Sequence, residues 1–184
     1  MGRKYQIRDQ ESLYFVTFTA VNWIDVFIRN TYKEIIIESI QYCQANKGLE
    51  VCAWCIMTSH IHLILGTKGE NKLEDIIRDL KSFTSRKIRN QIDSDIQESR
   101  KEWMMWMFKR AGKKNVRNND FQFWQQHNHP VELNSNEMME GRLNYIHQNP
   151  VEARFVSRAE DWIWSSARDY AEEGKGPIEL LFIE

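Results

Sequence analysis

Two histidines separated by one residue, His60 and His62, lie in an apolar run over residues 51–65. Its β-branched and aliphatic side chains favour β-strand, and Thr58-Ser59 predicts a tight turn within the run. Side chains two positions apart on a strand project from the same face, so both imidazoles point one way and Ile61 points the other. Two neutral imidazoles side by side supply half of a metal site.

The other half is predicted in residues 143–151, which contain Tyr145 and Asn149. A helix puts residues four apart on one face, and Pro150 places Asn149 in the last turn, because helical dihedrals are disfavoured before proline. If this helix lies beside the histidine strand, the Asn149 amide oxygen and the two imidazoles share a divalent ion. Tyr145 then stands one turn away. This arrangement suits attack of a tyrosine oxygen on a phosphodiester, which leaves a covalent phosphotyrosine.

The composition predicts a single domain over residues 1–184, with 42% apolar residues and a formal net charge of −1. No window is apolar enough to span a bilayer, and residues 1–9 lack the apolar core of a signal peptide. Three cysteines fit a reducing cytoplasm better than a disulfide framework. The positive charge is clustered rather than uniform. The candidate DNA contacts are Arg86, Lys87, Lys109, Arg110, Lys113, Lys114 and Arg117.

The order of predicted elements places these motifs on a fold. We expect strands over residues 13–20, 49–57, 60–65 and 121–126, and helices over residues 31–46, from Asn71, and from Ser135 or Asn136. Residues 91–119 have no clear assignment. The order β-α-β-β-α-β-α predicts an α+β ferredoxin-like sandwich, with helices packed on one face of an antiparallel sheet. Residues 172–184 form a tail that is either flexible or swapped with a second chain.

The two motifs together resemble a known family. The histidine pair, followed by Tyr-Ile-His-Gln-Asn-Pro-Val at residues 145–151, is similar to the single-tyrosine HUH transposases, and in particular to the REP-associated tyrosine transposases. The resemblance runs over residues 13–170 and implies the same ferredoxin-like fold. The turn before the histidines departs from the family pattern, because Thr58-Ser59 replaces its usual Pro-Asn.

The resemblance also implies an activity. Family members nick single-stranded DNA beside a hairpin and form a 5′-phosphotyrosine with Mg²⁺ or Mn²⁺. By this resemblance His60, His62 and Asn149 bind the metal and Tyr145 is the catalytic nucleophile of a transposase. The partner is single-stranded or hairpin DNA, and a homodimer remains open, as does the group that deprotonates Tyr145.

Two alternatives belong to other classes. A catalytically silent relative would keep the fold and bind hairpin DNA without cleaving it. A structural zinc protein would use Cys52 and Cys55 with the histidines. We disfavour zinc, because residues three apart on a regular strand point to opposite faces. His147 is expected to pack rather than to catalyse, because helical geometry turns it away from Tyr145.

Overall fold

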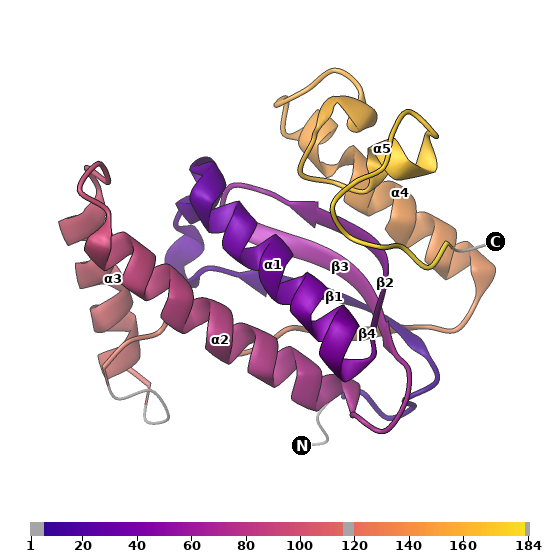
Figure 1. Cartoon of the computed structure of the whole chain (residues 1–184), viewed down its shortest axis with the longest axis horizontal. Helices are drawn as coiled ribbons and strands as arrows, with labels where there is room; N and C mark the ends of the chain where they lie inside the picture. Colours follow the sequence, from indigo (N-terminus) through magenta and orange to yellow (C-terminus); the bar gives the residue numbers. More distant parts are fainter. Residues whose placement is uncertain (1–5, 116–119, 183–184) are drawn as a thin grey trace.

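A computed structural model describes residues 6–115 and 120–182. Four antiparallel strands form one sheet in the order β2-β3-β1-β4 (Figure 1). The strands are β1 (Leu13–Thr19), β2 (Leu49–Ile56), β3 (His60–Thr67) and β4 (Val131–Leu133). This order, with β1 between β3 and β4, confirms the antiparallel α+β fold predicted from the sequence.

Five α-helices surround this sheet: α1 (Asn30–Lys47), α2 (Leu73–Ser94), α3 (Lys101–Lys113), α4 (Asn136–Glu152) and the single turn α5 (Ala167–Tyr170). Short 3-10 turns are η1 (Val21–Trp23), η2 (Val26–Ile28) and η3 (Ala159–Asp161). The crossover helices α1 and α2 lie side by side over one face of the sheet, as predicted (Figure 1). Helix α4 packs instead against β2 and β3 on the opposite face.

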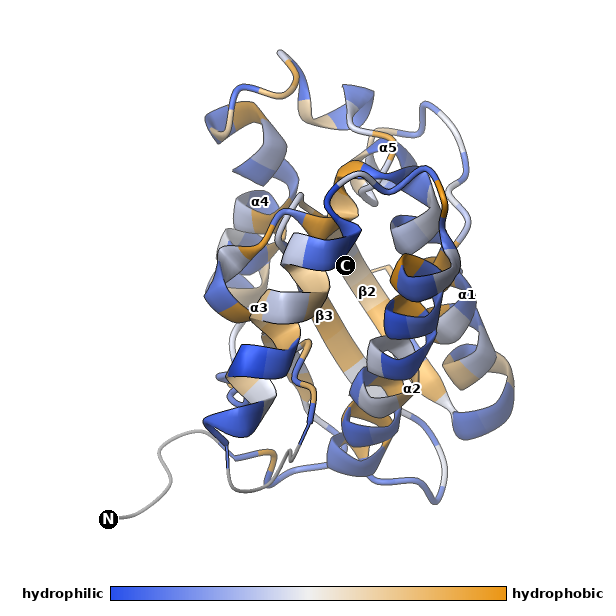
Figure 2. Ribbon diagram, turned by 90° about the vertical axis from the view of Figure 1, so that its left-hand side faces the viewer, coloured by the Kyte–Doolittle hydropathy of each residue, from blue (hydrophilic) through white to orange (hydrophobic). Residues whose placement is uncertain are grey.

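Strand β3 separates these two layers by simple alternation. Ile61 and Leu63 are fully buried in the larger core beneath α1 and α2. Ile64, on the opposite face, is buried in a smaller apolar cluster with Ile146 of α4. The strands are correspondingly apolar, while the outer surfaces of α2 and α3 are hydrophilic (Figure 2). The histidines therefore share the face that α4 covers, because they share the parity of Ile64.

The fourth strand lies later in the chain than the sequence pattern predicted. Residues 121–126 form only one isolated bridge, between Trp124 and Ala20, and the strand is Val131–Leu133. The prediction was wrong because apolar and polar residues alternate in this sequence but buried and exposed side chains do not. The neighbouring Phe123 and Trp124 are both buried in the larger core. Two adjacent side chains of a regular strand would point to opposite faces.

A β-bulge changes the geometry of the two cysteines. The register of β2 against β3 shifts between Val51 and Ala53. As a result Cys52 and Cys55 both lie in the apolar cluster that faces α4, so the argument from opposite faces was wrong. Burial raises the pKa of each thiol to about 12, which disfavours the thiolate that a metal would require.

The C-terminal segment packs against its own chain. Ile178 is buried in the larger core, the Gln41 side chain donates to the Pro177 carbonyl at 2.6 Å, and the Leu181 amide donates to Val51 at 2.9 Å. Residues 177–181 therefore run back over α1 and β2. Among the described residues, no helix combines the length and apolar content needed to cross a membrane.

Candidate active site

Four side chains from β3 and α4 meet on the covered face of the sheet. The His60 and His62 rings lie with centroids 4.7 Å apart, and the Tyr145 ring lies 5.1 Å from that of His62. The Asn149 amide nitrogen lies 3.5 Å from His62 Nε2. The structure thus brings together all four residues that the sequence motifs singled out.

Helix α4 positions Tyr145 and Asn149 one turn apart. It begins after Ser135, whose hydroxyl accepts a hydrogen bond from the Met138 amide at 3.2 Å, as an N-cap does. It continues through Pro150 to Glu152, so Asn149 lies in its last turn, as predicted. The buried proline stands close to the helix end, and the Ala153 amide still bonds to the Asn149 carbonyl at 3.0 Å. Asn149 consequently has helical neighbours on both sides.

The two imidazoles are held neutral. Burial lowers the pKa of His62 to about 3, and the nearby charges of His60 and Arg142 add to the effect. Burial also lowers the pKa of His60, although its hydrogen bond to Asn149 and the charge of Asp25 act in the opposite direction. A neutral imidazole keeps a lone pair that a cation can accept.

The donor set fits a divalent cation. Two imidazole nitrogens and an amide oxygen are available once the Asn149 amide is turned to present its oxygen to His62, a half-turn that its shape permits. Within the described parts of the chain, no three His, Cys, Asp or Glu side chains gather into a possible metal site. The Asn149 amide is the candidate third ligand beside the two imidazoles, and three ligands would leave positions for a phosphate oxygen and water.

A hydroxyl on the neighbouring strand orients His62. Thr17 lies opposite His62 in the β1–β3 register, and its Oγ1 lies 2.9 Å from His62 Nδ1. This bond leaves Nε2 facing Asn149. Outer partners of this kind hold an imidazole in the tautomer and orientation that a metal needs.

Removing this hydroxyl should weaken metal binding. We expect Thr17→Val to lower the affinity for Mn²⁺ about tenfold, because His62 loses the bond that fixes its ring. Titration followed by electron paramagnetic resonance measures the affinity. Thr19→Val is the matched control, because Thr19 lies opposite His60 two positions along the same strand. Equal affinities of wild type and Thr17→Val would show that the bond does not orient the ring.

Two further residues of the site were missed from the sequence. Arg142 lies three residues before Tyr145 on α4, and its guanidinium carbon stands 4.7 Å from the centre of the Phe15 ring. Phe15 in turn stacks on His62 at 5.6 Å and meets Tyr145 edge-on at 6.0 Å. The three-residue spacing to Tyr145 was the available signal for Arg142. Phe15 gave no signal, because its position depends on the strand register.

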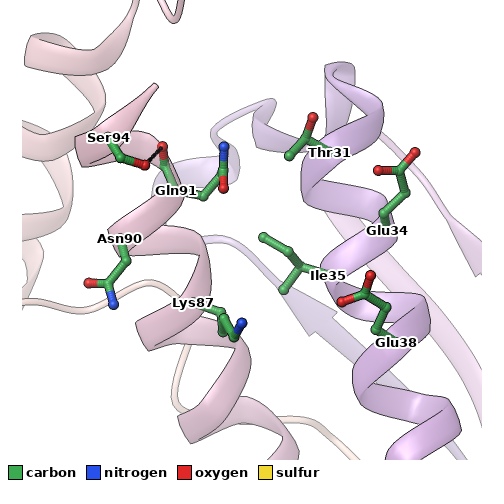
Figure 3. Close-up of a pocket in the computed structure, with 8 residues that line it drawn as sticks. All are labelled: Thr31, Glu34, Ile35, Glu38, Lys87, Asn90, Gln91 and Ser94. Carbon is green, nitrogen blue, oxygen red and sulfur yellow. Dashed lines mark hydrogen bonds between the residues drawn. The ribbon is translucent and has the colours of Figure 1, made fainter. Parts of the chain in front are cut away.

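The predicted DNA contacts do not join this cluster. Lys87 of α2 lines a groove between α1 and α2, together with Glu34 and Glu38 of α1 (Figure 3). These two helices cover the face of the sheet opposite the histidines. Arg86 is exposed on the same helix. The exposed residues Lys109, Arg110, Lys113 and Lys114 end α3, at the far end of the molecule from α4 (Figure 1). Arg117 lies outside the described residues.

His147 packs, as predicted. Its Nε2 lies 2.9 Å from the Ser166 hydroxyl, and its ring lies 5.2 Å from that of Tyr170. Burial lowers its pKa to about 4, so the ring is neutral. It ties α4 to the C-terminal segment on the side away from Tyr145.

Comparison with known proteins decides the family. Residues 12–111, more than half of the chain, match the family described as IS200-like transposases. The chain belongs to the IS200-like transposase family. The matched part of this transposase includes both histidines and ends before α4. The resemblance to single-tyrosine transposases that the sequence motifs indicated is confirmed at this level.

One solved structure agrees with the fold of this transposase over its whole length. A REP-associated tyrosine transposase bound to a REP hairpin matches with a TM-score of 0.66 and 16% identity, over 100% of this chain and 94% of that one. A putative transposase from Deinococcus radiodurans matches with a TM-score of 0.45 and 15% identity, over 81% of this chain and 95% of that one. No curated protein matches the transposase by sequence.

Proposed function

We propose that this transposase is a metal-dependent single-stranded DNA endonuclease and strand transferase with Tyr145 as its nucleophile. The observation that carries the proposal is the meeting of Tyr145, His60, His62 and Asn149. His62 and Asn149 stand 87 positions apart in sequence, and their side chains nevertheless come within 3.5 Å. A nucleophile beside a cation-binding donor set is what transfer of an anionic phosphodiester requires.

The side chains have distinct roles in this chemistry. His60, His62 and Asn149 would hold Mg²⁺ or Mn²⁺, which neutralises charge on the non-bridging phosphate oxygens. The Tyr145 oxygen forms the new bond to phosphorus as the phenol loses its proton. The bond from phosphorus to the 3′ oxygen breaks, and that oxygen leaves with a proton. The product is a 5′-phosphotyrosine, whose retained phosphoester lets another 3′ hydroxyl reverse the exchange.

DNA is the proposed partner. The family match and the solved transposase that is bound to a REP hairpin both support this proposal. The exposed basic end of α3 carries Lys109, Arg110, Lys113 and Lys114 and supports a role in holding flanking phosphates. Lys87 supports such a role less well, because two carboxylates share its groove. The free, buried thiols of Cys43, Cys52 and Cys55 support a reducing, cytoplasmic setting.

Arg142 supplies a cation on the same helix as the proposed nucleophile, and both side chains contact Phe15. Its guanidinium carbon lies 4.7 Å from the centre of the Phe15 ring, and the ion pairs among the described residues do not include it, so it can take a phosphate. We expect Arg142→Gln to raise the KM for single-stranded DNA by ten- to a hundredfold, an order-of-magnitude range for one charge-assisted phosphate contact.

Cleavage kinetics on a labelled oligonucleotide measure the effect of Arg142→Gln, and Arg142→Lys should recover part of the loss. The matched control is Arg154→Gln, because Arg154 is an exposed arginine just after the end of α4. Unchanged kinetics of Arg142→Gln would remove the side chain from the site.

A covalent-adduct assay tests the proposed function. End-labelled hairpin oligonucleotides with single-stranded arms are mixed with the protein and Mn²⁺, and a denaturing gel detects any protein-linked fragment. We expect an adduct that EDTA prevents. Tight binding across a broad hairpin library with no adduct would favour the catalytically silent relative.

A further inference from the structure

A strained turn holds an aromatic side chain beside the proposed metal ligands. Asn22 and Trp23 have φ angles of 56° and 55°, so two consecutive non-glycine residues occupy the left-handed region. This region disfavours side chains larger than that of glycine, and such strain persists only where the surroundings impose it. Asn22 tolerates this region better than most residues, so the strain falls on Trp23, whose conformation is fixed by its neighbours and not by its own preference.

The surroundings do impose it. Val21 and Ile24, on either side of the strained pair, are buried in the larger core. The Val21 amide donates to the Phe123 carbonyl at 2.8 Å, and the Trp23 amide donates to the Ala20 carbonyl at 3.1 Å. Two anchored ends hold Asn22 and Trp23 at the tip of a short turn, and this backbone sets the direction in which the tryptophan side chain leaves the chain.

That direction places the indole at the rim of the candidate site. Trp23 is 58% exposed, and its ring centre lies 5.3 Å from that of His60, at an interplanar angle of 73°. His60 adjoins His62, and His62 adjoins Tyr145. The four rings follow one another across the site, with the exposed tryptophan at one end and the proposed nucleophile at the other.

We infer that Trp23 stacks on the unpaired base next to the phosphate that the transposase cuts. This inference rests on the proposed function, and the ligand class is a base of single-stranded DNA. Exposing a large apolar indole to water is unfavourable, and stacking on a base would bury its face. Such stacking does not depend on which base is present, because every base has an aromatic face. A nucleotide whose phosphate lies against the histidines has its neighbour within reach of this ring.

The test compares two DNA probes that differ only in their bases. One is a fluorescein-labelled hairpin with a single-stranded thymidine arm, and the other carries abasic residues throughout that arm. Binding is measured by anisotropy in EDTA, so no cleavage occurs. We expect Trp23→Ala to weaken binding of the thymidine-armed probe about tenfold, as for the loss of one stacked base. The variant should bind the abasic probe as wild type does.

Two variants sharpen the comparison. Trp23→Phe should keep most of the thymidine-dependent affinity, because a phenyl ring still stacks. Ile163→Ala removes another exposed apolar side chain, 63% exposed and distant in sequence, and should change neither probe. The Mn²⁺ affinity of Trp23→Ala should equal that of wild type.

Other outcomes overturn the inference. Equal losses on both probes, or a fall in Mn²⁺ affinity, would make Trp23 a structural cover for His60. No loss on either probe would remove it from the DNA path. If wild type and Trp23→Ala bind both probes equally tightly, the inference about Trp23 is overturned while the proposed function stands. A wild type that binds neither probe and forms no adduct overturns the proposed function together with it.

Discussion

Tyr145→Phe should abolish the protein–DNA adduct while leaving DNA binding intact. The substitution removes the oxygen that we propose attacks phosphorus, and loss of a covalent nucleophile lowers rates on the order of 10⁴-fold or more. The phenyl ring keeps the edge-on contacts of Tyr145 with His62 and Phe15. The fold and the metal ligands therefore stay in place, and only the chemical step is lost.

The experiment compares adduct yield, hairpin affinity and melting temperature in wild type and variant. Tyr42→Phe is the matched control, because Tyr42 is also exposed but lies on α1, on the other side of the sheet. Adduct formation by Tyr145→Phe at the wild-type rate would show that a different group attacks the DNA. Loss of adduct together with hairpin binding would assign Tyr145 to recognition instead.

Glu98→Gln should lower the free energy of unfolding by about 3 kcal/mol at pH 7. The Glu98 side chain is fully buried in the connection between α2 and α3. It accepts hydrogen bonds from Arg29 Nε at 2.9 Å, from Arg100 Nε at 3.0 Å and from the Tyr32 hydroxyl at 3.2 Å. A neutral amide would leave two arginines without their shared anion, which costs several kcal/mol in a buried network.

The same network makes the stability of the protein depend on pH. Burial alone would raise the pKa of Glu98, but the hydrogen bonds and charge of Arg100, with the Tyr32 hydroxyl, lower it to about 2. A lowered folded-state pKa stabilises the protein above the unfolded-state value of 4.5, and this contribution is lost as the pH falls toward 2. The difference between wild type and Glu98→Gln should thus shrink to about half or less at pH 3.

Urea denaturation at pH 7 and pH 3 measures both differences. Glu102→Gln is the control, because Glu102 is exposed in the first turn of α3. A Glu98→Gln difference below about 1 kcal/mol, the range of exposed ion pairs, would mean that solvent screens the network. A difference that stays constant between the two pH values would exclude the titration of Glu98 as its source.

The sequence predicted the site better than its surroundings. His60 and His62 could be assigned to one face because alternation on a strand is local, and Tyr145 and Asn149 because helical spacing is local. Whether β3 and α4 lie side by side depends on tertiary packing. From the sequence motifs alone, the meeting of the four side chains could be predicted only on the condition that they do. Arg142 was missed. Its three-residue spacing from Tyr145 could be read from the sequence, but only the contact with Phe15 gives a reason to place it in the site.

The errors had the opposite cause, in each case a local rule overruled by packing. Alternation over residues 121–126 indicated a strand, yet both Phe123 and Trp124 turn into the core. Alternation along a regular strand predicted that Cys52 and Cys55 point to opposite faces, yet the bulge in β2 places both in the same apolar cluster. The strained turn at Trp23 could not be predicted, because Asn22 tolerates left-handed backbone but nothing in the tryptophan side chain favours it.

Mass spectrometry of the covalent adduct tests the central claim most directly. The protein is incubated with a hairpin oligonucleotide and Mn²⁺, digested with nuclease and protease, and the modified peptide is sequenced by fragmentation. We predict a nucleotide remnant joined through phosphate to Tyr145 and to no other side chain. A remnant on a different residue, or cleaved DNA with no protein-linked remnant, would contradict the assignment of Tyr145 as the nucleophile.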